Sequence, residues 1–252
     1  MKSCIATGRR DYIPMETETK TAAFFDMDGT LLRGESQFSF LLYCLRHGIA
    51  PPFRSLCVAT QYASYLLGLS QDAKQLRASG FALFEGVSVE RLEAIGMEFY
   101  NFKLVHRIRR QSAALVAAHK KCGHTTVLVT SACELVVHPF AARFGFDAII
   151  ATRLLARDGF YTGERELPEP YGASKRQIVE RFCEQRSISP SDSFAYTDHH
   201  TDLSLLEFVG HPITVNPTRK LQAIVETKKW PTMDLDSLAV PTLAFQKIAS
   251  PC

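Results

Sequence analysis

Short apolar runs alternate along the chain with segments whose apolar residues recur at helical spacing. The first run, residues 22–25, stops at Asp26 and leads into a turn-like Asp-Gly-Thr stretch, which is typical of a buried strand ending at a loop. The later pattern predicts strands over 125–130, 148–151, 194–197 and 213–215, helices over 113–121, 134–144, 175–185, 203–209 and 219–228, and a small hairpin or turn over 159–164. This alternation predicts an α/β fold, a Rossmann-like doubly wound parallel sheet covered on both faces.

Residues 37–106 interrupt this alternation with helical periodicity alone, and Pro51, Pro52 and Gly68 divide the segment into separate helices. We therefore expect an all-helical insertion between the first strand and the rest of the sheet. The predicted organisation is a flexible tail over 1–20, a discontinuous core over 21–36 and 107–230, the helical insertion over 37–106, and a C-terminal extension over 231–252 that is partly disordered or packs on the surface.

Composition narrows the class of protein. The 252 residues are 46% hydrophobic and 22% charged, as in ordinary soluble domains. A net charge of +3 gives no general attraction to nucleic acid or to anionic membranes. No apolar stretch reaches the ~20 residues of a membrane span, and the seven cysteines include no C-x-x-C pair. We expect a cytoplasmic protein with reduced thiols, present as a monomer or homodimer, with no nucleic-acid partner and no membrane span.

Polar side chains gather where the predicted strands end. In a doubly wound sheet, ligands bind outside the carboxyl ends of the strands, and several separate segments place polar groups at that edge here. These groups are Asp26, Asp28, Ser131, Asp198 and Asp202, together with Lys175 at the start of a helix. The sequence therefore predicts one polar site assembled from distant parts of the chain.

These residue types suit phosphoryl transfer. The carboxylate of Asp26 can attack phosphorus and form an aspartyl-phosphate, and Asp28 can protonate the leaving alcohol and later deprotonate water. Because carboxylate and phosphate repel each other, the site needs cations. Asp26, Asp198 and a main-chain carbonyl can hold Mg²⁺, while Ser131, the amides after it and Lys175 can hold phosphate oxygens.

The same segments carry a family resemblance. Residues 25–31 (Phe-Asp-Met-Asp-Gly-Thr-Leu) resemble the first motif of the haloacid dehalogenase (HAD) superfamily, Asp-x-Asp-x-Thr, and residues 129–132 (Val-Thr-Ser-Ala) resemble its second. Lys175 matches the third motif, and residues 197–202 (Thr-Asp-His-His-Thr-Asp) match the fourth. The matches follow the family's order and span residues 22 to about 217. The insertion, with segments 151–154 and 158–163, resembles subfamily IB, the phosphoserine-phosphatase-like branch.

The resemblance implies an HAD-like core with a C1-type helical cap and a role for each matching residue. Asp26 would be the nucleophile and Asp28 the acid/base. Asp26, the carbonyl of Asp28 and Asp198 would bind Mg²⁺, with Asp202 in support. The phosphate-binding residues would be Ser131, Ala132 and Lys175.

The substrate side of the resemblance depends on two further positions. Glu35 stands nine residues past the nucleophile, where the branch carries a substrate-contacting glutamate. Where its phosphoserine enzymes carry a cap arginine that grips the substrate carboxylate, this chain has Gly80, with Arg77 one turn away. His199 and His200 replace the small residues usual in the fourth motif, and we interpret them as loop residues at the rim of the site.

These observations predict a Mg²⁺-dependent phosphatase acting on the phosphate monoester of a small, phosphoserine-like metabolite. Three alternatives remain open at this stage. A lipid phosphate, such as a lysophospholipid or phosphatidylglycerol phosphate, would imply peripheral lipid contact. A phosphotransferase would pass the phosphoryl group to an acceptor other than water. A non-catalytic phosphate-binding protein would use the fold alone.

Overall fold

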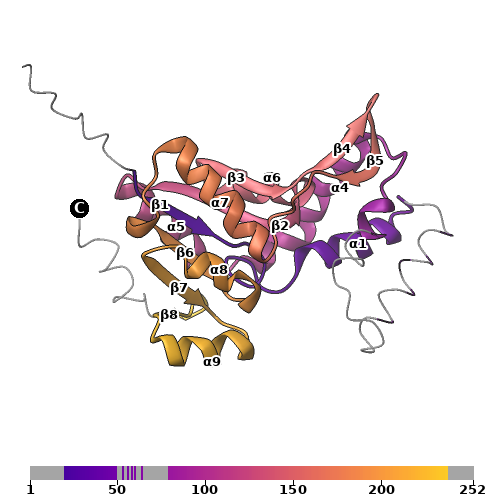
Figure 1. Cartoon of the computed structure of the whole chain (residues 1–252). Helices are drawn as coiled ribbons and strands as arrows, with labels where there is room; N and C mark the ends of the chain where they lie inside the picture. Colours follow the sequence, from indigo (N-terminus) through magenta and orange to yellow (C-terminus); the bar gives the residue numbers. More distant parts are fainter. Residues whose placement is uncertain are drawn as a thin grey trace, which may run out of the picture.

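The computed structural model describes residues 20–49 and 79–237, together with residues 53, 56, 58, 60 and 64 (Figure 1). Its centre is a six-stranded parallel sheet in the order β3-β2-β1-β6-β7-β8. The strands are β1 (Ala22–Phe25), β2 (Thr125–Cys133), β3 (Ala148–Thr152), β6 (Phe194–Thr197), β7 (His211–Val215) and β8 (Thr232–Met233). Because β1 lies between β2 and β6, the residue after β1 lies beside the carboxyl ends of both neighbours.

Helices cover both faces of this sheet. They are α5 (Ser112–Lys121), α6 (Glu134–Phe144), α7 (Ala173–Arg186), α8 (Leu203–Leu206) and α9 (Arg219–Lys228). Successive residues of a strand point to opposite faces, so Phe25 joins the core formed with α5 and α6, whereas Phe24 joins the core formed with α7, α8 and α9. The ring of Phe25 stacks on that of Tyr196 at 4.9 Å. The predicted doubly wound α/β fold is confirmed.

The described part of the insertion between β1 and α5 is helical, as expected. It contains α1 (Ser36–Arg46), α4 (Val89–Phe99), a π-helical turn η1 (Tyr100–Leu104) and a 3₁₀ turn η2 (Val105–Arg107). The ring of Phe40 packs against Phe84 and Phe99, with centroids 5.9 and 5.3 Å away. These rings belong to the same buried apolar cluster as Phe25 and Leu128, so the insertion shares its core with one face of the sheet.

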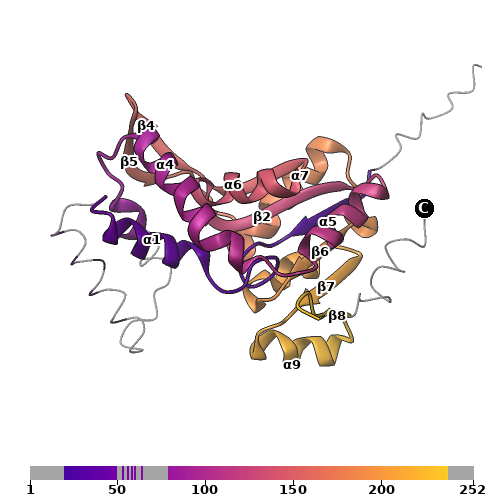
Figure 2. The same ribbon diagram turned by 180° about the vertical axis from the view of Figure 1, so that it is seen from behind.

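The cap packs against a hairpin and α6 of the second half of the chain (Figure 2). Strands β4 (Leu154–Arg157) and β5 (Phe160–Arg165) form an antiparallel hairpin. The main-chain oxygen of Tyr161 in this hairpin accepts a hydrogen bond from the amide of Gly86 at 2.8 Å, and the amide of Tyr161 donates to the main-chain oxygen of Val87 at 2.9 Å. Helix α4 also crosses α6 closely, because a Cβ on Gly96 would lie 2.6 Å from the main-chain oxygen of Leu135.

The expectation for the C-terminal extension over 231–252 is wrong for its first residues. Thr232 and Met233 form β8 and extend the sheet beside β7, and Leu235 is fully buried. The side chains of Met233 and Leu235 fill the apolar core next to β7, so this short segment covers an edge that would otherwise be open. Residues 1–19, 238–252 and most of 50–78 lie outside the described residues, and so do the predictions made for them.

Strand β2 continues to Cys133, so Ser131 lies within the last residues of the strand instead of after it. Among the described helices, none has both the length and the apolar character that a membrane crossing needs.

Candidate active site

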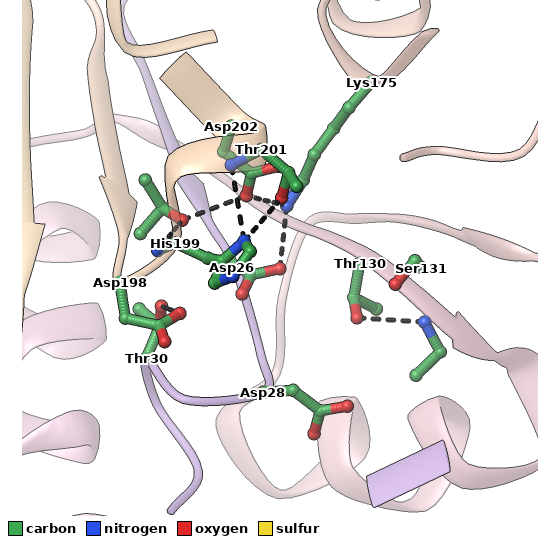
Figure 3. Close-up of polar contacts among 12 residues, drawn as sticks. Asp26, Asp28, Thr30, Thr130, Ser131, Lys175, Asp198, His199, Thr201 and Asp202 are labelled. Carbon is green, nitrogen blue, oxygen red and sulfur yellow. Dashed lines mark hydrogen bonds and ion pairs between the residues drawn. The ribbon is translucent and has the colours of Figure 1, made fainter. Parts of the chain in front are cut away.

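One cavity lies at the carboxyl edge of the sheet, where β1, β2 and β6 end. Its volume is about 340 Å³. The predicted polar residues that line it are Asp26, Asp28, Ser131, Lys175, Asp198 and Asp202 (Figure 3). The structure therefore brings together side chains that are up to 176 positions apart in the chain, Asp26 and Asp202 being the outermost. Ala132 is buried behind Ser131, and its amide donates to Thr130 Oγ1 at 3.1 Å.

Lys175 is the cation of the site. It lies in the first turn of α7, and its Nζ donates to Asp26 Oδ1 at 2.7 Å and to Asp202 Oδ2 at 2.5 Å. Thr197 Oγ1 also donates to Asp202 Oδ2, at 2.9 Å, so this carboxylate oxygen accepts hydrogen bonds from both Lys175 and Thr197. Burial lowers the pKa of Lys175, but the charges of Asp202 and Asp26 outweigh burial and leave the pKa above its ordinary value. The ammonium is therefore fixed between two carboxylates.

Asp198 adds a third carboxyl group beside Asp26 and Asp202. Burial raises the pKa of Asp26 well above its ordinary value, Lys175 opposes this shift, and Asp202 and Asp198 add to it. Burial likewise raises the pKa of Asp198 to about 6, against a hydrogen bond from Thr30 Oγ1 at 3.1 Å. Crowded, buried carboxylates of this kind are stabilised by a cation.

Asp28 is held differently from Asp26, although only one residue separates them. Ser36 Oγ at the start of α1 donates to Asp28 Oδ2 at 2.8 Å, and Asp28 Oδ1 is buried without a partner. Burial raises the pKa of Asp28 to about 7, and the charge of Glu35 adds to the shift. A carboxyl group with this pKa exchanges a proton readily near neutral pH.

The donor set fits a hard divalent cation. Asp26 and Asp198 supply two carboxylates, and the loop that follows Asp26 carries main-chain carbonyl groups at the same edge of the sheet. Among the described residues, no three side chains of the metal-ligating types form a complete ligand set. Mg²⁺ is commonly held by one or two carboxylates and keeps several water ligands.

A model of haloacid dehalogenase-like hydrolases matches residues 23–207. The chain belongs to this family. A probable phosphatase of Mycobacterium tuberculosis is 30% identical over 236 residues, covering 92% of this chain and 80% of the relative. A phosphoserine phosphatase of the same species is 28% identical over 218 residues, covering 84% and 70%. The structure of a phospho-aspartyl intermediate analogue of phosphoserine phosphatase shares the fold, with a TM-score of 0.60 at 18% identity over 87% of this chain and 95% of that one. The protein is a phosphatase of the HAD family.

The HAD phosphatase has further residues around the cavity that sequence reasoning did not single out. Thr30 is the threonine of the Asp-x-Asp-x-Thr pattern, which could have indicated it. Its hydroxyl donates a hydrogen bond to Asp198. Ser36 and Gln37 carry no motif signal, yet Gln37 Oε1 accepts from the amide of Cys133 at 2.9 Å and so joins the cap to the end of β2. Tyr171 lines the cavity from the segment before α7.

The wall of the cavity that faces the insertion includes the positions expected to contact substrate. Glu35, at the end of the first core segment, and Phe38 and Gly80 of the cap line the cavity together with His199. The rings of His199 and His200 lie 4.2 Å apart. Arg77 lies outside the described residues.

Proposed function

We propose that this HAD phosphatase hydrolyses the phosphate monoester of a small, phosphoserine-like metabolite, with Mg²⁺ and through a phosphorylated Asp26. The observation that carries the proposal is the pairing of two unlike aspartates at one cavity. Asp26 accepts from Lys175 at 2.7 Å, which suits a nucleophile, and the pKa of Asp28 is raised to about 7, which suits an acid/base. The relative named phosphoserine phosphatase supports the substrate class.

The reaction would proceed in two displacements. In the first, a carboxylate oxygen of Asp26 attacks phosphorus, the bond from phosphorus to the ester oxygen breaks, and Asp28 gives its proton to the departing alkoxide. In the second, Asp28 takes a proton from water as that water attacks phosphorus, and the carboxylate of Asp26 is released. Lys175 and Ser131 bind the phosphate oxygens throughout.

Mg²⁺ held by the carboxylates of Asp26 and Asp198 and by the main-chain carbonyl of Asp28 would neutralise and orient the phosphoryl group. Asp202 would act indirectly, by fixing Lys175. The cap, which we place at residues 37–106, would cover the cavity and limit the entry of water during attack.

The test is a panel of phosphorylated metabolites assayed with Mg²⁺ and with chelator. Asp26→Asn keeps the shape of the side chain and removes the nucleophile, so turnover should fall at least 10³-fold while the circular dichroism spectrum is unchanged. Asp192→Asn, at an exposed position in η3 (Pro190–Asp192), is the matched control and should keep full activity. Full activity in Asp26→Asn, or equal activity with chelator, would overturn the proposal.

A lipid phosphate is the second candidate substrate. Two large apolar side chains of the cap are strongly exposed, Phe53 at 78% and Leu56 at 64%. Apolar side chains exposed together favour contact with a lipid surface. Cleavage of a lysophospholipid phosphate that rises when detergent micelles are added, with no cleavage of small polar phosphates, would support this candidate over the first.

A further inference from the structure

The segment after β8 is linked to the loop that follows Asp26 through the guanidinium groups of Arg33 and Arg109. Asp236 Oδ1 accepts from Arg33 Nε and Nη2 at 3.0 and 2.7 Å, and Asp236 Oδ2 pairs with Arg109 Nη1. Arg109 Nη2 donates in turn to the main-chain oxygen of Gly29 at 2.7 Å. A residue near the end of the described chain is therefore two contacts away from the turn that follows the nucleophile.

The turn at Gly29 has little room to move. Gly29 has φ +75°, and a Cβ there would lie 2.1 Å from Asp198 Oδ2. The next residue, Thr30, donates its hydroxyl to Asp198 Oδ1 at 3.1 Å, and the preceding residue, Asp28, supplies the carbonyl proposed for Mg²⁺. A shift of the Gly29 carbonyl would therefore move the proposed metal-binding groups relative to one another.

The same segment also reaches the other side of Asp198. Asp234 Oδ1 accepts from Asn216 Nδ2 at 2.6 Å and from the amide of Asp236 at 2.9 Å. Two residues after Asn216, the amide of Thr218 donates to the main-chain oxygen of Asp198 at 2.8 Å. Residues 234–236 are therefore linked to both loops that carry the proposed metal ligands, to the Gly29 turn through Arg109 and to Asp198 through the segment from Asn216 to Thr218.

We propose that Asp236 and Arg109 are positioning residues of this phosphatase, which fix the Gly29 turn so that Asp26, the Asp28 carbonyl and Asp198 keep the spacing that Mg²⁺ requires. The inference rests on the proposed Mg²⁺-dependent function. The side chain of Arg109 is only 11% exposed and that of Asp236 is 28% exposed, so their ion pair is partly shielded from water and holds its geometry. Arg33 is 47% exposed and pairs with the other oxygen of the Asp236 carboxylate, so it supports Asp236 from the outside.

The experiment compares Asp236→Asn with Arg33→Met in the full chain. Asp236→Asn keeps the shape but weakens the pair with Arg109, and we expect the Mg²⁺ concentration for half-maximal activity to rise about tenfold, with KM for the phosphate ester within twofold. Arg33→Met leaves the contact from Arg109 to Gly29 in place and should keep the wild-type Mg²⁺ dependence. A second readout, independent of turnover, is the Mg²⁺ concentration that produces half of the Mg²⁺-induced rise in Tm, which should shift in parallel.

Each outcome decides between two roles. If Asp236 only anchored the end of the chain, both variants would lower Tm without changing the Mg²⁺ dependence, and the inference would be overturned. If Asp236→Asn does not fold, Arg109→Lys replaces it, because one ammonium cannot reproduce the fork that joins Asp236 to Gly29. If the wild-type protein cleaves no phosphate ester with Mg²⁺, the proposed function fails first. Wild-type cleavage with an unchanged Mg²⁺ dependence in both variants removes the positioning role alone.

Discussion

Two lysines form ion pairs of equal length, one buried and one exposed. Comparing them measures how burial changes the effect of an ion pair on the free energy of unfolding. Lys175 Nζ lies 2.5 Å from Asp202 and 2.7 Å from Asp26, and its side chain is 3% exposed. Lys228 Nζ lies 2.5 Å from Glu207, and these side chains are 42% and 43% exposed. Replacing each lysine with Met keeps an unbranched side chain of similar length and removes the ammonium group, with its charge and its hydrogen bonds. We expect the two substitutions to have very different effects on stability.

The difference follows from what each substitution leaves behind. Lys175→Met leaves Asp26 and Asp202 buried near Asp198 with no ammonium, and removing one partner of a buried ion pair costs about 3–5 kcal/mol. For a chain of this size that cost lowers Tm by roughly 6–20 °C. Lys228→Met frees a carboxylate that water can solvate, so its cost is about 0.2–1 kcal/mol.

The assay is urea unfolding in chelator, followed by circular dichroism, with the wild type as reference. A double variant, Lys175→Met with Asp202→Asn, removes one of the stranded charges and should recover at least about 1 kcal/mol relative to Lys175→Met alone. Equal costs for Lys175→Met and Lys228→Met would refute the reasoning. So would a double variant no more stable than the single one, because mutual repulsion of carboxylates would then not explain the loss.

Three further predictions concern other parts of the molecule. Burial and the charge of His124 lower the pKa of His119 to about 3, so below its ordinary pKa of 6.5 this group binds fewer protons in the folded state than in the unfolded state. The stability that His119 contributes should therefore be complete above pH 6.5, and the free energy of unfolding should fall by at most about 1.4 kcal/mol per pH unit below it. Urea titrations of His119→Gln should show a flatter dependence on pH. Gly96→Ala would place a Cβ against the Leu135 oxygen, and thermal melts should show a net loss of about 1–3 kcal/mol despite the better helix propensity of Ala; an unchanged Tm would mean that α4 can move away from α6 freely. Ser36→Ala removes the 2.8 Å hydrogen bond to Asp28, and steady-state kinetics should show kcat about tenfold lower with KM little changed.

Much of the core and the site could be predicted because local signals and tertiary structure agree there. The boundaries of α6, β6 and α9 match the periodicity of the sequence, and Gly145 ends α6 in the left-handed conformation that glycine favours. The motif around Asp26 could be placed at a strand end from its apolar lead and its turn alone. The meeting of distant polar groups then followed from the parallel topology.

The rest depends on contacts that no local pattern encodes. Strand β8 has only two residues and becomes a strand by pairing with β7. The sequence pattern of residues 232–237 therefore does not predict a strand. The bonds between Tyr161 and the cap join segments about 75 positions apart in the chain, and neither segment signals the other. Tyr171 reaches the cavity because of how the chain enters α7. Such contacts are set by packing, which overrides weak local preferences.

The place of β1 in the middle of the sheet also bears on how the chain assembles during synthesis. Both strands that flank β1 are made much later, β2 from residue 125 and β6 from residue 194. Until both have left the ribosome, the apolar Ala-Ala-Phe-Phe strand has two unpaired edges, and unpaired apolar edges promote aggregation. A prematurely ended chain that lacks β6 would therefore be both inactive and poorly soluble, and chaperone binding to nascent chains should be strongest before residue 197 emerges.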